Sequence, residues 1–137
     1  MNSTILNRLS DVAKAMKPLD HGGKSFHTSF AVRRGKVICI GVNDYKKAHP
    51  YHRFGEYRNV KDIYKDPYRP CLHSEVSIAI RLGLDSWKEL EIVNIRVGAD
   101  NKILNAKPCL NCERLIIQPL NPKRLFYSDD NGEFKQL

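Results

Sequence analysis

The sequence predicts an α/β domain in which helices cover the faces of a mixed β-sheet. Apolar residues recur at helical spacing in three segments, which predicts three helices. Runs of strand length, either apolar or alternating, lie between these segments, and two of them form a predicted hairpin. Helices that alternate with strands are typical of layered α/β folds. The chain has 137 residues and is 42% hydrophobic, so we expect one domain over residues 1–137.

The N-terminal segment predicts a helix that packs on one face of the sheet. Its apolar residues recur at helical spacing, at Ile5, Leu9, Val12, Ala13 and Met16. Residues 2–4 supply candidate N-caps, and Pro18 is expected to stop the helix. Polar residues interrupt the apolar ones, so the segment does not have the continuous apolar stretch of a secretory signal.

Two β-rich runs and a long irregular segment follow. Residues 29–33 and 36–41 flank Arg34-Gly35 and predict a hairpin, with the almost continuously apolar second run as the more buried strand. Residues 43–70 have no clear periodicity and contain five of the six tyrosines, interleaved with lysines and arginines. A loop of this length in a compact domain is often functional, and a short helix is predicted near residues 60–64.

The second half of the chain predicts alternating helices and strands. The apolar residues of 73–82 occupy most of a helix circumference, which indicates a helix buried on most sides and ended at Gly83. Pro119 is expected to end the last helix, and a turn at 129–132 leads into a polar tail. The other expected elements are strand 91–97, short strand 103–104, helix 109–118 and strand 123–128.

Two short motifs supply a candidate metal site. His73-Ser74-Glu75 begins one predicted helix, and Pro108-Cys109-Leu110-Asn111-Cys112 begins another. One histidine and two cysteines are three ligands of the type that zinc prefers, and a fourth position left to water distinguishes catalytic from structural zinc. Helix N-termini favour thiolate over thiol. Glu75 lies two residues from His73, so it is a candidate general acid and base for that water.

Other interpretations of these residues remain open. A C-x-x-C pair also occurs in structural zinc sites, which need a fourth cysteine or histidine ligand. The candidate fourth donors are His27, Cys39, His49, His52 and Cys71. A site without metal, in which His73 only caps a helix, is the remaining alternative.

Together the motifs form the H-x-E…P-C-x-x-C signature of zinc nucleobase deaminases. From about Phe26 to Asp129 the chain resembles the cytidine and deoxycytidylate deaminases, including the short phage-type enzymes. The resemblance implies a three-layer fold with a mixed five-stranded sheet flanked by helices. It implies Zn2+ bound by His73, Cys109 and Cys112, with Glu75 as proton shuttle. Zinc-bound hydroxide would convert a cytosine base to uracil in a free nucleotide or nucleoside, such as dCMP, CMP or cytidine.

The resemblance also implies three substrate contacts. Asn43, in Gly41-Val42-Asn43, matches the family's G-x-N, whose asparagine contacts the sugar or base; a plain turn role is the alternative. Ser74 stands where the family more often has alanine and uses the backbone N–H. Tyr127, or its neighbour Phe126, matches a position that often stacks near the base, with core packing as the alternative. Some family members bind a second zinc, for which the candidate ligands are His49, His52 and Cys71.

The charge bears on the partners. A net charge of +8 attracts phosphates, and the expected partner is a small-molecule nucleotide or nucleoside. Two alternatives are a deaminase acting on cytosine or adenine in tRNA or single-stranded DNA, and a non-catalytic zinc module that binds nucleic acid. The resemblance implies a homo-oligomer. No apolar run approaches the ~20 residues of a membrane span, so we expect a cytoplasmic protein without a membrane partner, in the host cytoplasm if a phage encodes it. The sequence leaves the sugar and the phosphate state open.

Overall fold

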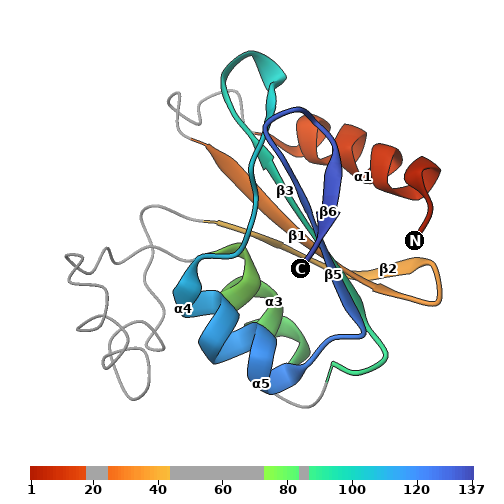
Figure 1. Ribbon diagram of the computed structural model, residues 1–137, viewed down its shortest axis with the longest axis vertical. Helices are drawn as coiled ribbons and strands as arrows, with labels where there is room; N and C mark the ends of the chain where they lie inside the picture. Colours follow the sequence, from red (N-terminus) through yellow and green to blue (C-terminus); the bar gives the residue numbers. More distant parts are fainter. Residues whose placement is uncertain (18–24, 44–72, 84–86) are drawn as a thin grey trace.

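The computed structural model describes residues 1–17, 25–43, 73–83 and 87–137 and shows three layers (Figure 1). The central layer is a mixed sheet with the strand order β2-β1-β3-β5-β6, in which β4 pairs with one end of β3. The β3–β5 pair is parallel, and the other pairs are antiparallel. The strands are β1 (Phe26–Arg33), β2 (Lys36–Val42), β3 (Glu91–Val97), β4 (Ile103–Leu104), β5 (Arg124–Ser128) and β6 (Phe134–Gln136).

Helices cover both faces of this sheet, which confirms the predicted fold class. Helix α1 (Ser3–Met16) lies on one face (Figure 1). The other face carries α3 (Ser74–Leu82) and a continuous helical run. A short turn of 3-10 helix, η2 (Ala99–Asn101), follows β3. The run consists of α4 (Leu110–Cys112), the π-helical η3 (Glu113–Ile117) and α5 (Gln118–Leu120). No helix in the described part of the chain has the length and hydropathy needed to cross a membrane.

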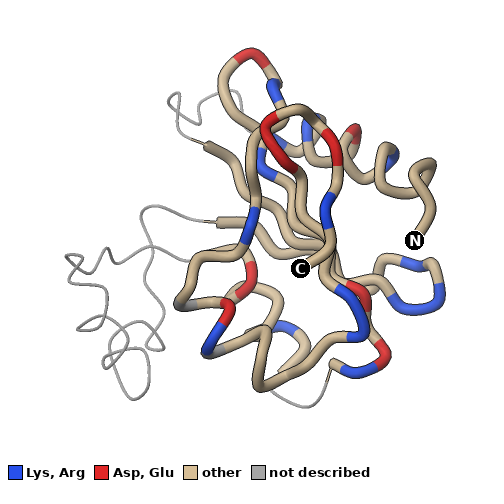
Figure 2. Tube along the Cα trace, in the orientation of Figure 1, with Lys and Arg blue, Asp and Glu red and all other residues tan. Residues whose placement is uncertain are grey.

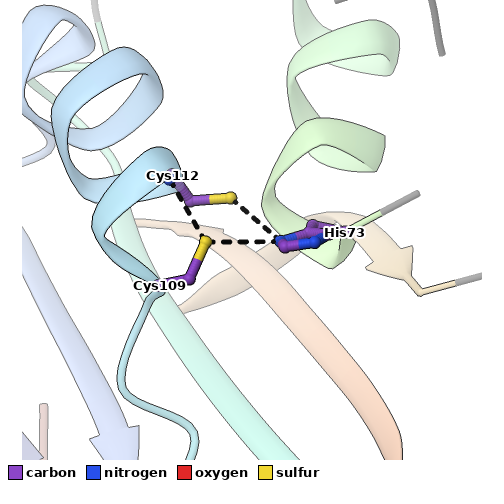
Figure 3. A group of neighbouring side chains, drawn as sticks. All are labelled: His73, Cys109 and Cys112. Atoms are coloured by element: carbon purple, nitrogen blue, oxygen red, sulfur yellow. Dashed lines mark hydrogen bonds between the residues drawn. The ribbon is translucent and has the colours of Figure 1, made fainter. Parts of the chain in front are cut away.

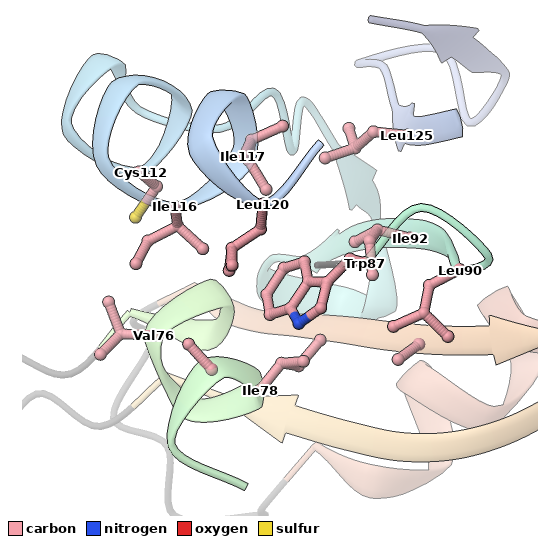
Figure 4. Packing of buried hydrophobic residues seen from close by; sticks show 12 residues of the cluster. Val76, Ile78, Trp87, Leu90, Ile92, Cys112, Ile116, Ile117, Leu120 and Leu125 are labelled. Carbon is pink, nitrogen blue, oxygen red and sulfur yellow. The ribbon is translucent and has the colours of Figure 1, made fainter. Parts of the chain in front are cut away.

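The alternation of side chains along the strands divides the core in two. Phe30, Val93 and Ile95 point towards α1 and pack with its Leu9 and Ala13. On the opposite face, Ala31, Ile92 and Leu125 pack with the helices, and Trp87 fills the space between α3 and the helical run (Figure 4). Both faces of the central strands are therefore mostly apolar, because helices cover each of them.

The first helix agrees with its prediction except in the side chains that it buries. Asn2 is the N-cap, and its Oδ1 accepts a hydrogen bond of 3.0 Å from the backbone N–H of Ile5. Leu6, Leu9, Ser10 and Ala13 face the sheet. The predicted apolar face is therefore rotated, and Val12 is 41% exposed. Pro18 lies outside the described residues.

The hairpin is confirmed, but the prediction of its more buried strand is wrong. Strand β1 lies between β2 and β3 and is almost fully buried, whereas β2 is the edge of the sheet. Val37 and Ile38 are 42% and 41% exposed. A continuous apolar run is typical of a strand covered on both faces, and here it lies at an edge where each face is only partly covered. Gly41 approaches α3 closely, and its backbone passes beside Ser74 and Ile78.

The C-terminal part of the chain departs from the prediction in two places. Pro119 lies inside the helical run, which continues to Leu120 and stops at Asn121 with φ 52°. The π-helical turn before it, in which the N–H of Gln118 bonds to the carbonyl of Glu113, accommodates a residue without an N–H. The polar tail forms β6 after the predicted turn, so the sheet has six strands where five were expected. The predictions for residues 44–72 lie outside the described residues.

Candidate active site

Three candidate metal ligands from two distant segments meet at one place (Figure 3). The Nδ1 atom of His73 lies 3.4 Å from the Sγ atom of Cys109 and 3.5 Å from that of Cys112. The ligand atoms of the three residues all lie within 4.8 Å of one another. The structure thus brings together the three side chains that the two motifs predict as zinc ligands.

Both segments present their ligands at the start of a helix. His73 is the N-cap of α3, and its carbonyl accepts a 3.0 Å hydrogen bond from the N–H of Ser77. Cys109 is the N-cap of α4, and its sulfur accepts a 3.4 Å hydrogen bond from the N–H of Cys112. Backbone N–H groups at such positions stabilise a negative sulfur, as predicted from the sequence.

The loop that leads to Cys109 is fixed by hydrogen bonds to the end of the sheet. The N–H of Ala106 donates to the carbonyl of Ser128 at 2.8 Å, and the N–H of Asn105 donates to Oδ1 of Asp130 at 2.9 Å. These bonds hold the first cysteine in place relative to β5.

The donor set fits zinc. Zinc takes imidazole nitrogen and thiolate, and a nitrogen and a sulfur on one tetrahedral zinc lie about 3.5 Å apart, from bond lengths of ~2.0 and ~2.3 Å. The observed N···S separations of 3.4 and 3.5 Å agree with this value. Among the described residues the group has three members, and neither His27 nor Cys39 joins it. The other proposed fourth donors, His49, His52 and Cys71, lie outside the described residues.

The protonation state of Cys109 suits metal binding. Hydrogen bonding by Cys112, and then the hydrogen bond and charge of His73, lower the pKa of Cys109 from 9.0 to about 4. The sulfur is therefore a thiolate at neutral pH, which is the form that binds a metal. By contrast, burial raises the pKa of Cys39 in β2, and Arg81 acts against this rise.

Glu75 lies in the first turn of α3 and is 7% exposed. Its Oε1 accepts a 3.0 Å hydrogen bond from the hydroxyl of Ser74, and its Oε2 accepts one of 3.3 Å from Nδ2 of Asn94. Burial raises the pKa of Glu75, and the negative charge of Cys109 adds to the rise, while His73 and the Ser74 hydrogen bond oppose it. A carboxyl group whose pKa is raised towards neutrality suits general acid–base chemistry.

A cavity of about 150 Å³ adjoins these side chains. Its walls contain Glu75, two of the three candidate ligands and two of the three predicted substrate contacts. The lining residues are His27, Thr28, Asn43, His73, Ser74, Glu75, Asn94, Ala106, Lys107 and Cys109.

The three predicted substrate contacts have different surroundings. Asn43 lines the cavity, and its side chain bonds to the start of β1, through the N–H of His27 at 3.0 Å and the carbonyl of Ser25 at 3.3 Å. Ser74 lines the cavity too, and its hydroxyl joins the hydrogen bonds around Glu75. Tyr127 does not line the cavity; it packs against the helix-side core, the alternative that the sequence left open.

Sequence reasoning missed Asn94 and Ser29. Asn94 lies in the strand predicted over residues 91–97, and its side chain is 2% exposed in a central strand of the sheet. Ser29 is fully buried and lies opposite Asn94 in the β1–β3 pair. A polar residue within an apolar strand that is covered on both faces is the signal that could have identified them.

The chain was compared with known proteins. No protein-family model matches the sequence, and no curated protein sequence matches it. The fold is similar to that of the crystal structure of cytidine deaminase from Burkholderia pseudomallei, with a TM-score of 0.57 and 15% sequence identity. The alignment covers 100% of this chain and 92% of that chain. The fold is therefore cytidine deaminase-like, with a candidate metal site of one histidine and two cysteines.

Proposed function

We propose that this protein is a zinc-dependent hydrolase that deaminates the cytosine base of a free nucleoside or nucleotide. The observation that carries the proposal is the convergence of His73, Cys109 and Cys112 beside a cavity that also contains a buried carboxyl group, Glu75. The cytidine deaminase-like fold supports the same reaction class.

The chemistry divides between a metal and the side chains. Bound zinc would lower the pKa of water towards ~7, which makes hydroxide available at neutral pH. Glu75 would accept the two protons of the attacking water in turn and deliver one to the ring nitrogen and one to the departing amine. The oxygen of water ends as the O4 carbonyl of uracil, and the amine leaves as ammonia. A single carboxyl group can perform both transfers because it faces the cavity next to the metal ligands.

Other cavity residues are suited to holding a nucleoside. The amide of Asn43 is fixed by two hydrogen bonds to the start of β1, so its direction is set before a substrate binds. Lys107 adds a positive charge to the cavity wall, where a substrate phosphate could bind.

The alternative of a polynucleotide substrate rests on the net positive charge of the protein, which attracts phosphates. The lysines and arginines of the described residues are dispersed over several elements, with one group at the β1–β2 turn formed by Arg33, Arg34 and Lys36 (Figure 2). Within the described part of the chain these charges form no continuous basic path of the kind that binding of a long strand needs, which supports the small substrate.

The test is turnover by the zinc-loaded protein. Cytidine and adenosine nucleosides, nucleotides and short oligonucleotides are incubated with it, and ammonia and the product base are quantified. We expect uracil from a monomeric substrate, loss of turnover in Glu75→Gln and full turnover in the exposed control Glu89→Gln. A wild-type protein with about one zinc per chain and no turnover of any substrate would refute the proposal. Activity on oligonucleotides alone, falling steeply with salt, would favour the polynucleotide alternative.

A further inference from the structure

Two buried polar residues of the sheet support Glu75, in addition to its neighbour Ser74 in α3. Asn94 contacts Glu75 directly, and Ser29 contacts Asn94. Ser29 in β1 and Asn94 in β3 lie directly opposite each other in the antiparallel ladder, so their side chains lie side by side on one face. This face is the one covered by α3 and the helical run, and the two residues are 0% and 2% exposed. Residues 29 and 94 therefore form a polar patch on the sheet directly below the start of α3.

A chain of hydrogen bonds joins this patch to the carboxyl group. The hydroxyl of Ser29 lies 2.7 Å from Oδ1 of Asn94 and 2.8 Å from the hydroxyl oxygen of Ser74. Nδ2 of Asn94 lies 3.3 Å from Oε2 of Glu75, and the hydroxyl of Ser74 lies 3.0 Å from Oε1. The four side chains form a closed ring of polar contacts, in which each of the two carboxyl oxygens has its own partner.

The ring fixes which end of the Asn94 amide faces Glu75. The 2.7 Å separation between Ser29 and Oδ1 is the length of an O–H···O hydrogen bond and leaves the amide oxygen as the acceptor. The N–H end of the amide must then face Glu75. The reverse orientation would place two oxygens, Oδ1 and Oε2, against each other.

The arrangement has the features of a support for a functional group rather than of a core contact. Asn94 reaches the cavity, where it lies between the sheet and Glu75, but it is not among the three candidate metal ligands. A buried polar side chain destabilises a core unless its hydrogen bonds are made, and here both ends of the Asn94 amide are used. A catalytic group that is held to within about 0.5 Å needs such supporting hydrogen bonds.

We propose that Asn94 is a positioning residue for Glu75 and that Ser29 sets the direction of the Asn94 amide. The kinetic consequence rests on the deaminase function proposed above. Asn94 holds Oε2 of Glu75 so that the carboxyl group is aimed before the substrate enters, and Ser29 keeps an N–H donor, and not a carbonyl, directed at it.

The variants Asn94→Ala, Asn94→Asp and Ser29→Ala test the proposal. The matched control is Ser128→Ala, which removes a fully buried hydroxyl with two hydrogen bonds, to Leu104 and Arg96, outside the cavity and leaves the backbone carbonyl that accepts from Ala106. We expect kcat to fall roughly 10–100-fold in Asn94→Ala and at least as far in Asn94→Asp, whose carboxylate repels Glu75. The kcat of Ser29→Ala should fall by about 3–10-fold. KM should stay within about threefold and zinc at about one per chain, because substrate and metal contacts are retained.

Crystal structures of the same variants supply a second readout that does not depend on turnover. The Glu75 carboxyl group should leave its position beside Ser74 in Asn94→Ala and keep it in Ser128→Ala. The proposal is overturned if Glu75 does not move, if kcat is unchanged in Asn94→Ala and Ser29→Ala, or if Ser128→Ala loses as much activity. If Asn94→Ala does not fold, Ser29→Ala decides by the same two measurements. If the wild type is inactive on every substrate, the deaminase function fails, and the crystal structures still decide whether Asn94 positions Glu75.

Discussion

The sharpest prediction concerns Gly41→Ala, which adds a single methyl group to β2 on the side that faces α3. A Cβ atom at residue 41 would lie 2.4 Å from the backbone oxygen of Ser74 and 2.9 Å from both N and Cγ1 of Ile78. The backbone of Gly41 is not in the left-handed region, so alanine meets no conformational strain there. The whole effect of the substitution therefore comes from the contact with α3.

The size of the effect follows from these distances. Cβ atoms essentially never come closer than 3.0 Å to another atom, so the Ser74 oxygen must retreat by at least 0.6 Å from its 2.4 Å separation. Two of the three obstructing atoms, the Ser74 oxygen and the Ile78 nitrogen, belong to the backbone of α3, so we expect the first turn of the helix to move and His73 and Glu75 to move with it. Overpacking of this kind costs about 1–3 kcal/mol, which lowers Tm by roughly 3–10 °C in a domain of this size. A displacement near 1 Å in a catalytic group lowers activity by up to about 100-fold.

The assay compares Gly41→Ala with a control glycine. At Gly98 a Cβ atom would lie 2.5 Å from Cδ1 of Leu104, the flexible end of a side chain that can rotate away. We expect thermal unfolding, zinc content and kcat/KM of Gly98→Ala to stay close to wild type, while Gly41→Ala loses both stability and activity. If Gly41→Ala keeps the wild-type Tm and kcat/KM, the contact between β2 and α3 does not position the site, and the reasoning fails.

The remaining predictions concern the metal ligands and the groups whose pKa is shifted by the fold. Cys112→Ser should reduce bound zinc well below one per chain by elemental analysis, whereas Cys39→Ser should retain it; equal zinc in both would exclude Cys112 as a ligand. In the metal-free protein, Cys109 should react with iodoacetamide at a rate nearly constant from pH 6 to 8, because its pKa is about 4, while the rate for Cys39 should still rise above pH 9. Parallel pH profiles in peptide mass spectrometry would contradict this. Because burial raises the pKa of Glu75, the folded metal-free protein loses stability as pH rises through that pKa; Glu75→Gln should gain Tm over wild type at pH 8 and little at pH 4. A gain that is the same at both pH values would show that ionisation of Glu75 does not limit stability.

The sequence was sufficient for the parts of the site that depend on local chemistry. His73 and Cys109 precede apolar helical segments, and both are N-caps in the structure. Their convergence depends on the α/β order, in which two helices lie on the same face of one sheet. The two N-cap positions were predictable because each follows from a short run of neighbouring residues.

The features that sequence reasoning missed depend on strand order. The burial of β2 was misjudged because an apolar run does not show which strand is at the edge, and only the pairing of β1 with β3 places β2 there. Asn94 was missed for the same reason. Its partners Ser29 and Glu75 are 65 and 19 residues away in the sequence, and they become neighbours only through the register of β1 against β3 and the position of α3.

The separation of the two motifs along the chain has a consequence for the degradation of the protein in a cell. His73 and Cys109 are 36 residues apart, so a zinc ion bound by both, as proposed above, would tie the first turn of α3 to the start of α4 as a crosslink would. Such a tie exists only in the native arrangement, so the energy of metal capture also opposes local opening. Cells starved of zinc should therefore degrade this protein faster than well-supplied cells, and its abundance should follow metal supply even when its synthesis does not change.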